Sequence, residues 1–439
     1  MPIERLWPSI EVLSEEYVLV QAWKKTATHI RYHNWYADTL ALDRAAVNLP
    51  QFLSELRDAV RRPLEWRNAP LRMVPAPKSQ RWRVAKTTGL WGPVGGDKGV
   101  KLRPLAHAEL KSQVLATAIM MCLADRVETA QRDPRLDIDN ADARRSLVSY
   151  GNRLFCDSVG GELRHRWGSS KLYRGYYQDY QRFIQRPELV AETVEPGIGK
   201  RMVIVHSDLK QFYDRVEVSQ FRTKLNELLE PSDDPQFGEL VARVMSWQWD
   251  PRDYAEVAGY ARQAGIDDFS SIALPQGLVA AGFFANAFLL DFDQELRNAI
   301  GSEFVYGLHL VDVARYVDDL RFVFEAADEL SLPEIEQLSH RAIQAVLDRA
   351  APGLQVSQEK TLAAALKEGG RPLIRQSRKM ARIQSAASGG FDVAGGIEIL
   401  DAVQGLIRAQ ERYSEGFCRD SGERLKATFV VGPPQKARE

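Results

Sequence analysis

The stretch ARYVDDLRFVF, residues 314–324, sets two adjacent carboxylates, Asp318 and Asp319, between two short apolar runs. Both flanks are rich in Val, Leu, Tyr and Phe and partly alternate with polar residues, which is the pattern of β-strands. An Asp-Asp step between such strands is typical of a tight hairpin turn. The two carboxylates then project from the hairpin tip, either as a polar surface turn or toward a metal ion. Taken alone, so short a motif favours the surface turn.

The composition is that of an ordinary globular protein, with 439 residues, 45% hydrophobic and 27% charged. This length allows roughly two to four domains. No apolar run approaches a membrane span, and the N-terminal MPIERLWPSIEVLSEEY has acids and a proline where a signal peptide needs an apolar core. The three cysteines, at positions 122, 156 and 418, fit neither a disulfide framework nor a zinc site. We therefore expect a cytoplasmic protein without a membrane segment.

Positive charge is concentrated between Arg57 and Lys111, where 13 Lys and Arg stand against 4 Asp and Glu, although the whole chain has a net charge of −1. Trp66, Trp82 and Trp91 lie among these basic residues. Basic residues interleaved with aromatic ones suit a nucleic-acid strand, which offers phosphates and stackable bases. The alternative is a solvated basic face above tryptophans of the core, and the sequence favours neither.

The periodicity of the chain predicts an α+β fold. Residues 1–60 are predicted to be helical, and residues 65–104 form β-rich pieces around a glycine-rich loop. A long helix follows, and a second helix is expected to end before Arg186-Pro187. The chain then alternates as strand (201–207), helices (216–230, 236–262 and 276–300), hairpin (304–324), helix (333–350) and strand (354–365). This split pattern predicts an antiparallel sheet backed by helices.

Asp208 ends the strand RMVIVHS, and we expect it to meet Asp318 and Asp319 at one edge of this sheet. Three converging carboxylates repel one another unless cations bridge them. Mg²⁺ prefers oxygen ligands and usually keeps waters and substrate phosphates as well, so two or three carboxylates suffice. Two such ions about 3.5–4 Å apart assist in-line displacement at phosphorus.

Four segments, HSDLKQFYD, LPQGLVAAGFFAN, YVDD and GLQVSQEKT, occur in the order of the successive palm motifs of reverse transcriptases. Upstream, VKLRPL resembles the fingers motif of the same family, so the resemblance covers about residues 80–365. One such motif is weak, whereas four in order, each in its expected structural context, favour a polymerase. The resemblance implies a right-hand polymerase with an N-terminal helical extension, fingers with an insert, a palm, and a thumb-like or helical C-terminal region, over residues 1–60, 61–200, 201–366 and 367–439.

The resemblance also implies a catalytic centre. Asp208 and Asp318 would hold two Mg²⁺ ions, for which Mn²⁺ is an alternative, and Asp319 would complete the pair. The carbonyl of Leu209 would help to coordinate the metal on the nucleotide side. Lys360 matches the lysine that protonates or neutralises the leaving pyrophosphate.

Further positions match the nucleotide site of the family. Tyr213 matches the aromatic gate that crowds a ribose 2′-hydroxyl and favours deoxynucleotides. Gln276 and Gly277 match the segment that lies against the incoming nucleotide and template, where glycine permits close approach of the backbone. Arg103 would contact the triphosphate, aided by Lys98 or Lys101.

Departures from the family pattern point to a subgroup. Ala281 and Gly282 replace the Ser-Pro of many relatives, and this variant, the N-terminal helices and the insert around SYGNRLFCD resemble the bacterial abortive-infection and unknown-group enzymes, which are mostly antiviral defence proteins. An RNA template, a DNA product and deoxynucleoside triphosphates are the implied partners, with a non-coding RNA or an accessory defence protein as further ones. A protein-primed or template-independent polymerase and an inactive nucleic-acid-binding scaffold remain open as alternatives. We expect Arg315 and Arg321 to face solvent or the primer strand.

Overall fold

The computed structural model describes residues 5–33, 38–78, 82–84, 89, 91–93 and 101–365. The C-terminal region expected at 367–439 and the predicted nucleotide ligand Lys98 lie outside these residues. Within the described part, no helix has the length and apolar character needed to cross a membrane.

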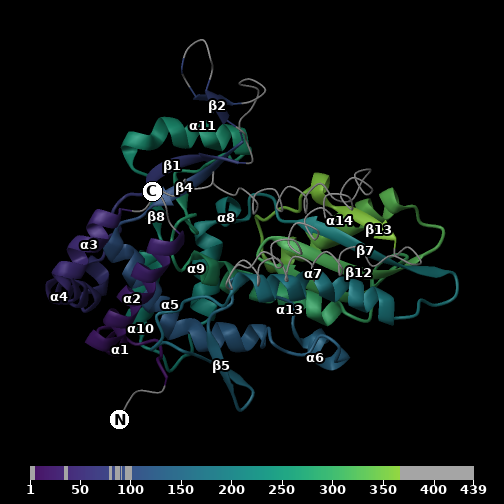
Figure 1. Ribbon diagram of the computed structural model, residues 1–439, viewed down its shortest axis with the longest axis horizontal. Helices are drawn as coiled ribbons and strands as arrows, with labels where there is room; N and C mark the ends of the chain where they lie inside the picture. The colour runs from purple at the N-terminus through teal and green to yellow at the C-terminus, as the bar shows by residue number, and fades with distance from the viewer. Residues whose placement is uncertain are drawn as a thin grey trace, which may run out of the picture.

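A five-stranded sheet forms the centre of the part that carries the sequence motifs (Figure 1). Its order is β10-β11-β12-β7-β13, and every neighbouring pair is antiparallel, as the split pattern of strands and helices predicts. The strands are β7 (Lys200–Asp208), β10 (Glu303–Val305), β11 (Leu308–Tyr316), β12 (Asp319–Ala327) and β13 (Leu362–Ala365). The hairpin β11–β12 therefore lies inside the sheet, between two other strands, and its turn is held on one side by β7.

Helices cover both faces of this sheet, as the alternation along β7 requires. Met202 and Ile204 pack with Val190 under α7 (Tyr176–Thr193) on one face. Val203 and Val205 belong to the main core on the other face, where α14 (Leu332–Ala350) and α13 (Leu290–Ala299) lie. Burial on both faces explains why β7 reads as a nearly continuous apolar run.

The expected helix over residues 236–262 is interrupted. The structure has α10 (Pro235–Val244), a short strand β8 (Trp247–Gln248) and α11 (Tyr254–Ala264) instead. The backbone of this break pairs with a remote segment, because the Leu71 amide donates to Gln248 and the Asp250 amide donates to Leu71, both at 2.8 Å. The bulky side chains of Trp247 and Trp249 are buried there, so tertiary contacts override the local helical preference.

Helix α7 runs past the point where a proline was expected to end it. Pro187 lies inside the helix, and the prediction that the helix ends before Arg186 is wrong. The Arg186 guanidinium is fully buried and makes two hydrogen bonds of 2.7 Å to the carboxylate of Asp312 on β11. A proline in a helix costs about 3 kcal/mol. Leaving one member of a buried ion pair without its partner costs about 3–5 kcal/mol. The pairing of Arg186 with Asp312 can therefore offset the cost of a proline inside the helix.

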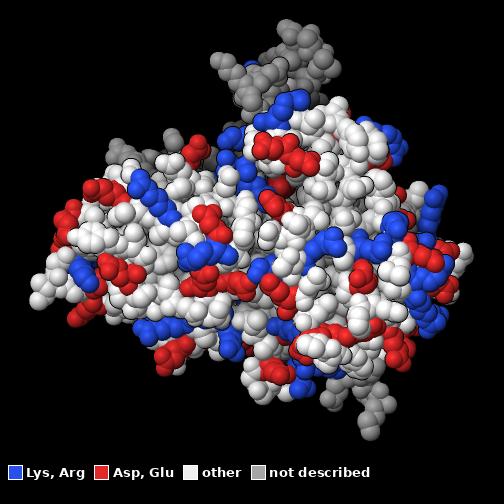
Figure 2. Space-filling view, turned by 180° about the vertical axis from the view of Figure 1, so that it is seen from behind, with Lys and Arg blue, Asp and Glu red and all other residues white. Residues whose placement is uncertain are grey.

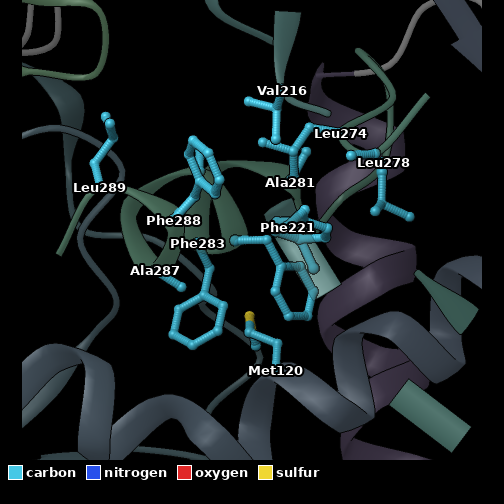
Figure 3. Close-up of a cluster of buried hydrophobic side chains, with 14 of the residues drawn as sticks. Met120, Val216, Phe221, Leu274, Leu278, Ala281, Phe283, Ala287, Phe288 and Leu289 are labelled. Atoms are coloured by element: carbon cyan, nitrogen blue, oxygen red, sulfur yellow. The ribbon is translucent and has the colours of Figure 1, made fainter. Parts of the chain in front are cut away.

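The predicted apolar helix over residues 276–300 begins later and is divided in two. It consists of α12 (Ala281–Phe288) and α13, separated at Leu289. Figure 3 shows α12 directing Phe283 and Phe288 into a buried cluster with Phe221 of α9 (Val218–Glu227) and Met120 of α5 (Leu110–Gln131). Residues 276–280 are not helical, because their backbone bonds to other segments, as described for the site below.

The N-terminal helices lie to one side of the central sheet (Figure 1), and the described residues also form four two-stranded sheets. Trp66 is buried among them, so it belongs to the core and cannot stack on a nucleic acid, while the side chains of Trp82 and Trp91 lie outside the description. The elements not yet named are α1 (Ile10–Leu13), α2 (Glu16–His33), α3 (Thr39–Val47), α4 (Leu49–Val60), β1 (Arg72–Pro77), β2 (Trp82–Val84), β3 (Trp91–Pro93), β4 (Leu102–His107), α6 (Ala141–Ser146), β5 (Cys156–Val159), β6 (Glu162–His165), α8 (Phe212–Arg215) and β9 (Ser271–Ile272).

A buried lysine joins these N-terminal helices to the insert. Lys25 of α2 is fully buried, and its ammonium donates to the carbonyls of Arg166, Ser169 and Lys171 at 3.3, 2.6 and 2.9 Å. Burial lowers the pKa of Lys25 to about 7. The Lys25→Met variant keeps the length of the side chain but leaves three carbonyls without this donor, so we expect it to lose about 3 kcal/mol of unfolding free energy. Urea unfolding measures the loss.

Lys24→Met is the matched control, because Lys24 is exposed on the same helix. Its effect should stay within about 0.5 kcal/mol. Equal unfolding midpoints for the two variants would show that the three carbonyls do not depend on Lys25.

Candidate active site

The central sheet places three aspartates at one edge. Asp208 is the last residue of β7, and Asp319, the first residue of β12, lies directly opposite it in the register of the two strands. Asp318 is in the two-residue turn between β11 and β12, and its carbonyl accepts a hydrogen bond from the Leu209 amide at 3.0 Å. The juxtaposition expected from the sequence is therefore present in the fold.

The turn between β11 and β12 has an unusual backbone. Val317 has a φ of +58°, in the left-handed region, which is strained for a β-branched residue. Gly151 of the insert lies against it so closely that a Cβ there would be 2.6 Å from Cγ2 of Val317. Arg315 donates to the Val317 carbonyl at 2.9 Å. Gly151 and Arg315 therefore both stabilise the backbone of the turn at Val317.

Arg315 does not face solvent or a primer strand as expected, whereas Arg321 is partly exposed. Arg315 is fully buried and holds both carboxylate oxygens of Asp293 on α13, at 2.7 and 2.6 Å. Arg321 is partly buried on the face covered by α7, with its guanidinium 5.5 Å from the ring centre of Phe183. Their partners come from helices that are distant in sequence, so alternation along the strand alone could not place them.

A lysine lies beside the carboxylates. The Lys360 ammonium is 2.9 Å from Oδ1 of Asp208. Burial raises the pKa of Asp208, the neighbouring charge of Lys360 lowers it, and the charge of Asp319 raises it further. Because burial favours the neutral carboxyl, the cation beside Asp208 helps to keep it ionised.

Asp208, Asp318 and Lys360 line an open cleft of about 1220 Å³, and Asp319 is not among its lining residues. Of the predicted site residues, Asp208, Leu209, Tyr213, Gln276, Asp318, Lys360, Lys101 and Arg103 line the cleft. The strand β4 brings Lys101 and Arg103 there from the N-terminal half of the chain. The face of the molecule seen in Figure 2 shows Lys and Arg interspersed with Asp and Glu. The lining of the cleft combines several cationic side chains with Asp208 and Asp318.

Sequence reasoning missed Lys78, which follows β1 and lines the same cleft. Its amide donates to the Lys101 carbonyl at 2.7 Å. Burial lowers the pKa of Lys78, as do the charges of Lys360 and Arg103, while Asp208 and Asp318 raise it. No local pattern marks Lys78, because only the antiparallel pairing of β1 with β4 brings it to the cleft of the carboxylates.

Gln276 and Gly277 are fixed by segments on both sides. The Gln276 carbonyl accepts from the Ala106 amide at 2.8 Å, and its side chain donates to Asp214 at 2.9 Å. Gly277 has a φ of +138°, which requires glycine, and its carbonyl accepts from Gln113 at 2.9 Å. Gln276 lines the cleft, whereas Gly277 does not. These contacts hold the Gln-Gly backbone in place and explain why α12 starts only at residue 281.

Asp214 is a second residue that the sequence did not reveal. Its carboxylate accepts from the Tyr260 hydroxyl at 2.6 Å and from the Gln276 amide, and burial raises its pKa. It directly follows Tyr213, whose partly buried ring lines the cleft. Burial raises the pKa of Tyr213, and the charge of Asp318 raises it further. Asp214 thus aligns Gln276, and Tyr213 lies near Asp318.

The carboxylate oxygens of the cleft are suitable ligands for Mg²⁺, but the protein supplies only part of the ligands that the ion needs. Asp208 and Asp318 both line the cleft and offer hard oxygen ligands. In the part of the chain that the structure describes, no three His, Cys, Asp or Glu side chains gather closely enough to hold a metal by themselves. Mg²⁺ usually binds through one or two carboxylates together with substrate phosphates and waters, so this arrangement suits an ion that arrives with a nucleotide.

Comparison with known families agrees with this geometry. Residues 177–383 match the family described as reverse transcriptase (RNA-dependent DNA polymerase). No curated protein matched the chain at a significant level. The match includes the carboxylates, Tyr213, the Gln-Gly segment and Lys360, and it leaves out the VKLRPL segment, so the fingers assignment stays a prediction. Members of this family are RNA-directed DNA polymerases that generally bind an RNA template and deoxynucleotides and use divalent metals. The mixed helix-and-sheet fold is consistent with the match, and residues 177–383 are therefore a reverse transcriptase domain.

Proposed function

We propose that this protein is a nucleotidyltransferase that copies RNA into DNA, with its palm at residues 201–366, its fingers at 61–200 and a thumb-like region at 367–439. The observation that carries the proposal is the convergence of Asp208, Asp318 and Asp319 at one sheet edge. This edge opens into a cleft of about 1220 Å³, large enough for a nucleotide.

In this proposal Asp208 and Asp318 bind two Mg²⁺ ions, Mn²⁺ serving as an alternative, with the Leu209 carbonyl as a further ligand and Asp319 completing the acidic group. Bound Mg²⁺ would lower the pKa of a primer 3′-hydroxyl and neutralise the leaving pyrophosphate. Lys360, whose ammonium lies 2.9 Å from Oδ1 of Asp208, is proposed to protonate or neutralise the leaving pyrophosphate, and this ion pair supports the proposal.

Arg103 and Lys101 are proposed to bind the triphosphate from the opposite wall, since both line the cleft. Lys98 is proposed for the same role from sequence alone. Gln276 and Gly277 form the surface against which the incoming nucleotide and template lie. Tyr213 is proposed to exclude the ribose 2′-hydroxyl, because its ring lines the cleft.

We also propose that the enzyme acts in the bacterial cytoplasm in defence against phages, with a non-coding RNA or an accessory defence protein as partner. The support is the resemblance of the insert and of the Ala281-Gly282 variant to defence-associated reverse transcriptases. Sequencing the nucleic acid that copurifies with the protein before and after phage infection tests this role. Identical, non-specific nucleic acid in both samples would contradict it.

The biochemical proposal is tested by offering the purified protein an RNA template, a DNA primer and Mg²⁺ with either deoxynucleotides or ribonucleotides. We expect a DNA product. A product without template or primer would instead show the template-independent or protein-primed alternative, and no product with any nucleotide set would favour a non-catalytic scaffold.

The Tyr213→Ala variant should raise ribonucleotide incorporation relative to deoxynucleotide incorporation by about 10- to 100-fold, because the ring no longer fills the space beside C2′. The ratio of kcat/KM for the two nucleotides measures this. Tyr306→Ala is the matched control, since Tyr306 is 80% exposed in the turn between β10 and β11. An unchanged ratio in Tyr213→Ala would refute the role of Tyr213.

A further inference from the structure

The segment Val148–Asn152, here called the brace loop, connects the carboxylate turn with Tyr213. Its backbone pairs with β11, because the Arg315 amide donates to Val148 and the Tyr150 amide donates to Arg315, both at 2.9 Å. At its far end, Asn152 Nδ2 donates to the Tyr213 hydroxyl at 3.3 Å. A single short loop thus touches both the turn that carries Asp318 and the aromatic ring of the cleft.

The brace loop is itself fixed from α12. Asn286 is buried, and its amide group donates to the carbonyls of Gly151 and Asn152 at 2.8 and 3.4 Å. Its Oδ1 accepts from Arg315 at 3.2 Å. Asn152 has a φ of +51°, a left-handed conformation that asparagine tolerates better than most residues. The position of the Asn152 side chain is therefore determined by its surroundings.

Gly282 leaves the space that this side chain occupies. A Cβ at position 282 would lie 2.7 Å from Cγ and Nδ2 of Asn152 and 2.9 Å from its Cβ. Contacts below 3.0 Å force a shift. Gly282 lies in α12 and has a negative φ, which any residue can adopt. The reason for glycine here is therefore the lack of space for a Cβ, and the backbone conformation does not require it. The Ala281-Gly282 variant of the motif and the asparagine of the insert are thus two parts of one contact.

We infer that Asn152 is a specificity-determining residue that fixes Tyr213 against the sugar of the incoming nucleotide, in a space that exists only because residue 282 is glycine. The inference rests on the proposed role of Tyr213. Asn152 touches neither nucleotide nor metal ligand in this scheme, so it acts by positioning. Without its hydrogen bond the phenol ring can swing away from the ribose, and the 2′-hydroxyl of a ribonucleotide finds room.

The test measures kcat/KM for a deoxynucleotide and for the matching ribonucleotide on the full chain with an RNA template, a DNA primer and Mg²⁺. Asn152→Ala should lower the preference for the deoxynucleotide about five- to tenfold, which is the range expected for the loss of one hydrogen bond. The rate with the deoxynucleotide should change less than the preference. Gly282→Ala should lower the preference similarly, because the added methyl displaces Asn152, whereas Gly259→Ala, where nothing lies within 4 Å of the added atom, should not.

Two double variants make the result specific. Asn152→Ala should have no further effect in the Tyr213→Phe background, because the acceptor hydroxyl is already gone. Adding Gly282→Ala to Asn152→Gly should also change nothing further, because glycine at position 152 lacks all three atoms that the added methyl group would meet. Full, additive effects in either pair would overturn the inference.

The outcomes separate the inference from the proposed function. If Tyr213→Ala leaves the sugar preference unchanged, the proposed gate itself fails. If Tyr213→Ala changes the preference but Asn152→Ala and Gly282→Ala do not, the gate stands and the positioning role of Asn152 is refuted.

Discussion

Replacing Asp318 by asparagine is expected to lower nucleotide incorporation by about 10³-fold or more while leaving the protein folded. The substitution keeps the size of the side chain and removes its charge. Loss of a ligand that places a metal ion at phosphorus removes several kcal/mol of transition-state stabilisation, and each 1.4 kcal/mol is a factor of ten in rate. Single-turnover primer extension with Mg²⁺ measures the effect, and Asp208→Asn should behave alike.

Asp348→Asn is the matched control, because it also removes one negative charge from the lining of the cleft. Asp348 lines the same cleft from α14, is exposed and accepts a hydrogen bond from Gln344. Its substitution should leave incorporation within about twofold, because exposed charges contribute little. Removing a crowded carboxylate often leaves stability unchanged or higher, so the thermal midpoint of Asp318→Asn should not fall. Incorporation within tenfold of the unmodified protein would show that Asp318 holds no catalytic metal.

Arg315→Met is expected to destabilise the protein by about 3–5 kcal/mol and to reduce incorporation as well. The variant leaves Asp293, which is also buried, without its partner, and removal of one member of a buried ion pair typically costs this much. It also removes the donor to the Val317 carbonyl, so the strained backbone before Asp318 loses a support. Urea unfolding and primer extension measure the two effects separately.

Arg321→Met, on the paired strand, is the control, because Arg321 is partly exposed and its guanidinium lies over the ring of Phe183. A cation over an aromatic ring contributes about 0.5–1 kcal/mol at such a site. The double variant Arg315→Met/Asp293→Leu should recover much of the lost stability, since no buried charge then remains unpaired. If Arg315→Met is no less stable than Arg321→Met, the buried pair is not what holds the turn.

Local patterns in the sequence were sufficient to predict the central antiparallel sheet and the aspartates at its edge. The apolar run before Asp208 and the alternation around Asp318 mark strands through side-chain periodicity, which is a property of the chain itself. One strand ends in Asp208, and the hairpin turns at Asp318 and Asp319. If the strand and the hairpin pair in one antiparallel sheet, few registers are possible. Their convergence was therefore predictable, and the structure has it.

Other expectations failed where a remote partner overrides a local preference. Arg315 was expected at the surface because arginine seldom lies buried, and the partner that makes burial possible, Asp293, lies on a different element. Helix α7 continues through Pro187 because the neighbouring Arg186 pairs with Asp312 on β11. The helix expected from residue 276 starts later because Ala106 and Gln113 bind the backbone of the Gln-Gly segment.

The strands of the central sheet and the carboxylates at their ends could be predicted from the chain, because both depend on residues that are neighbours in sequence. The side chains that surround those carboxylates depend instead on the tertiary packing. Two residues of the cleft, Lys78 and Asp214, owe their roles to contacts with segments far away in sequence. The same holds for Asn152, which bonds to Tyr213. Such contacts depend on the packing of whole elements and leave no periodic signal in the chain.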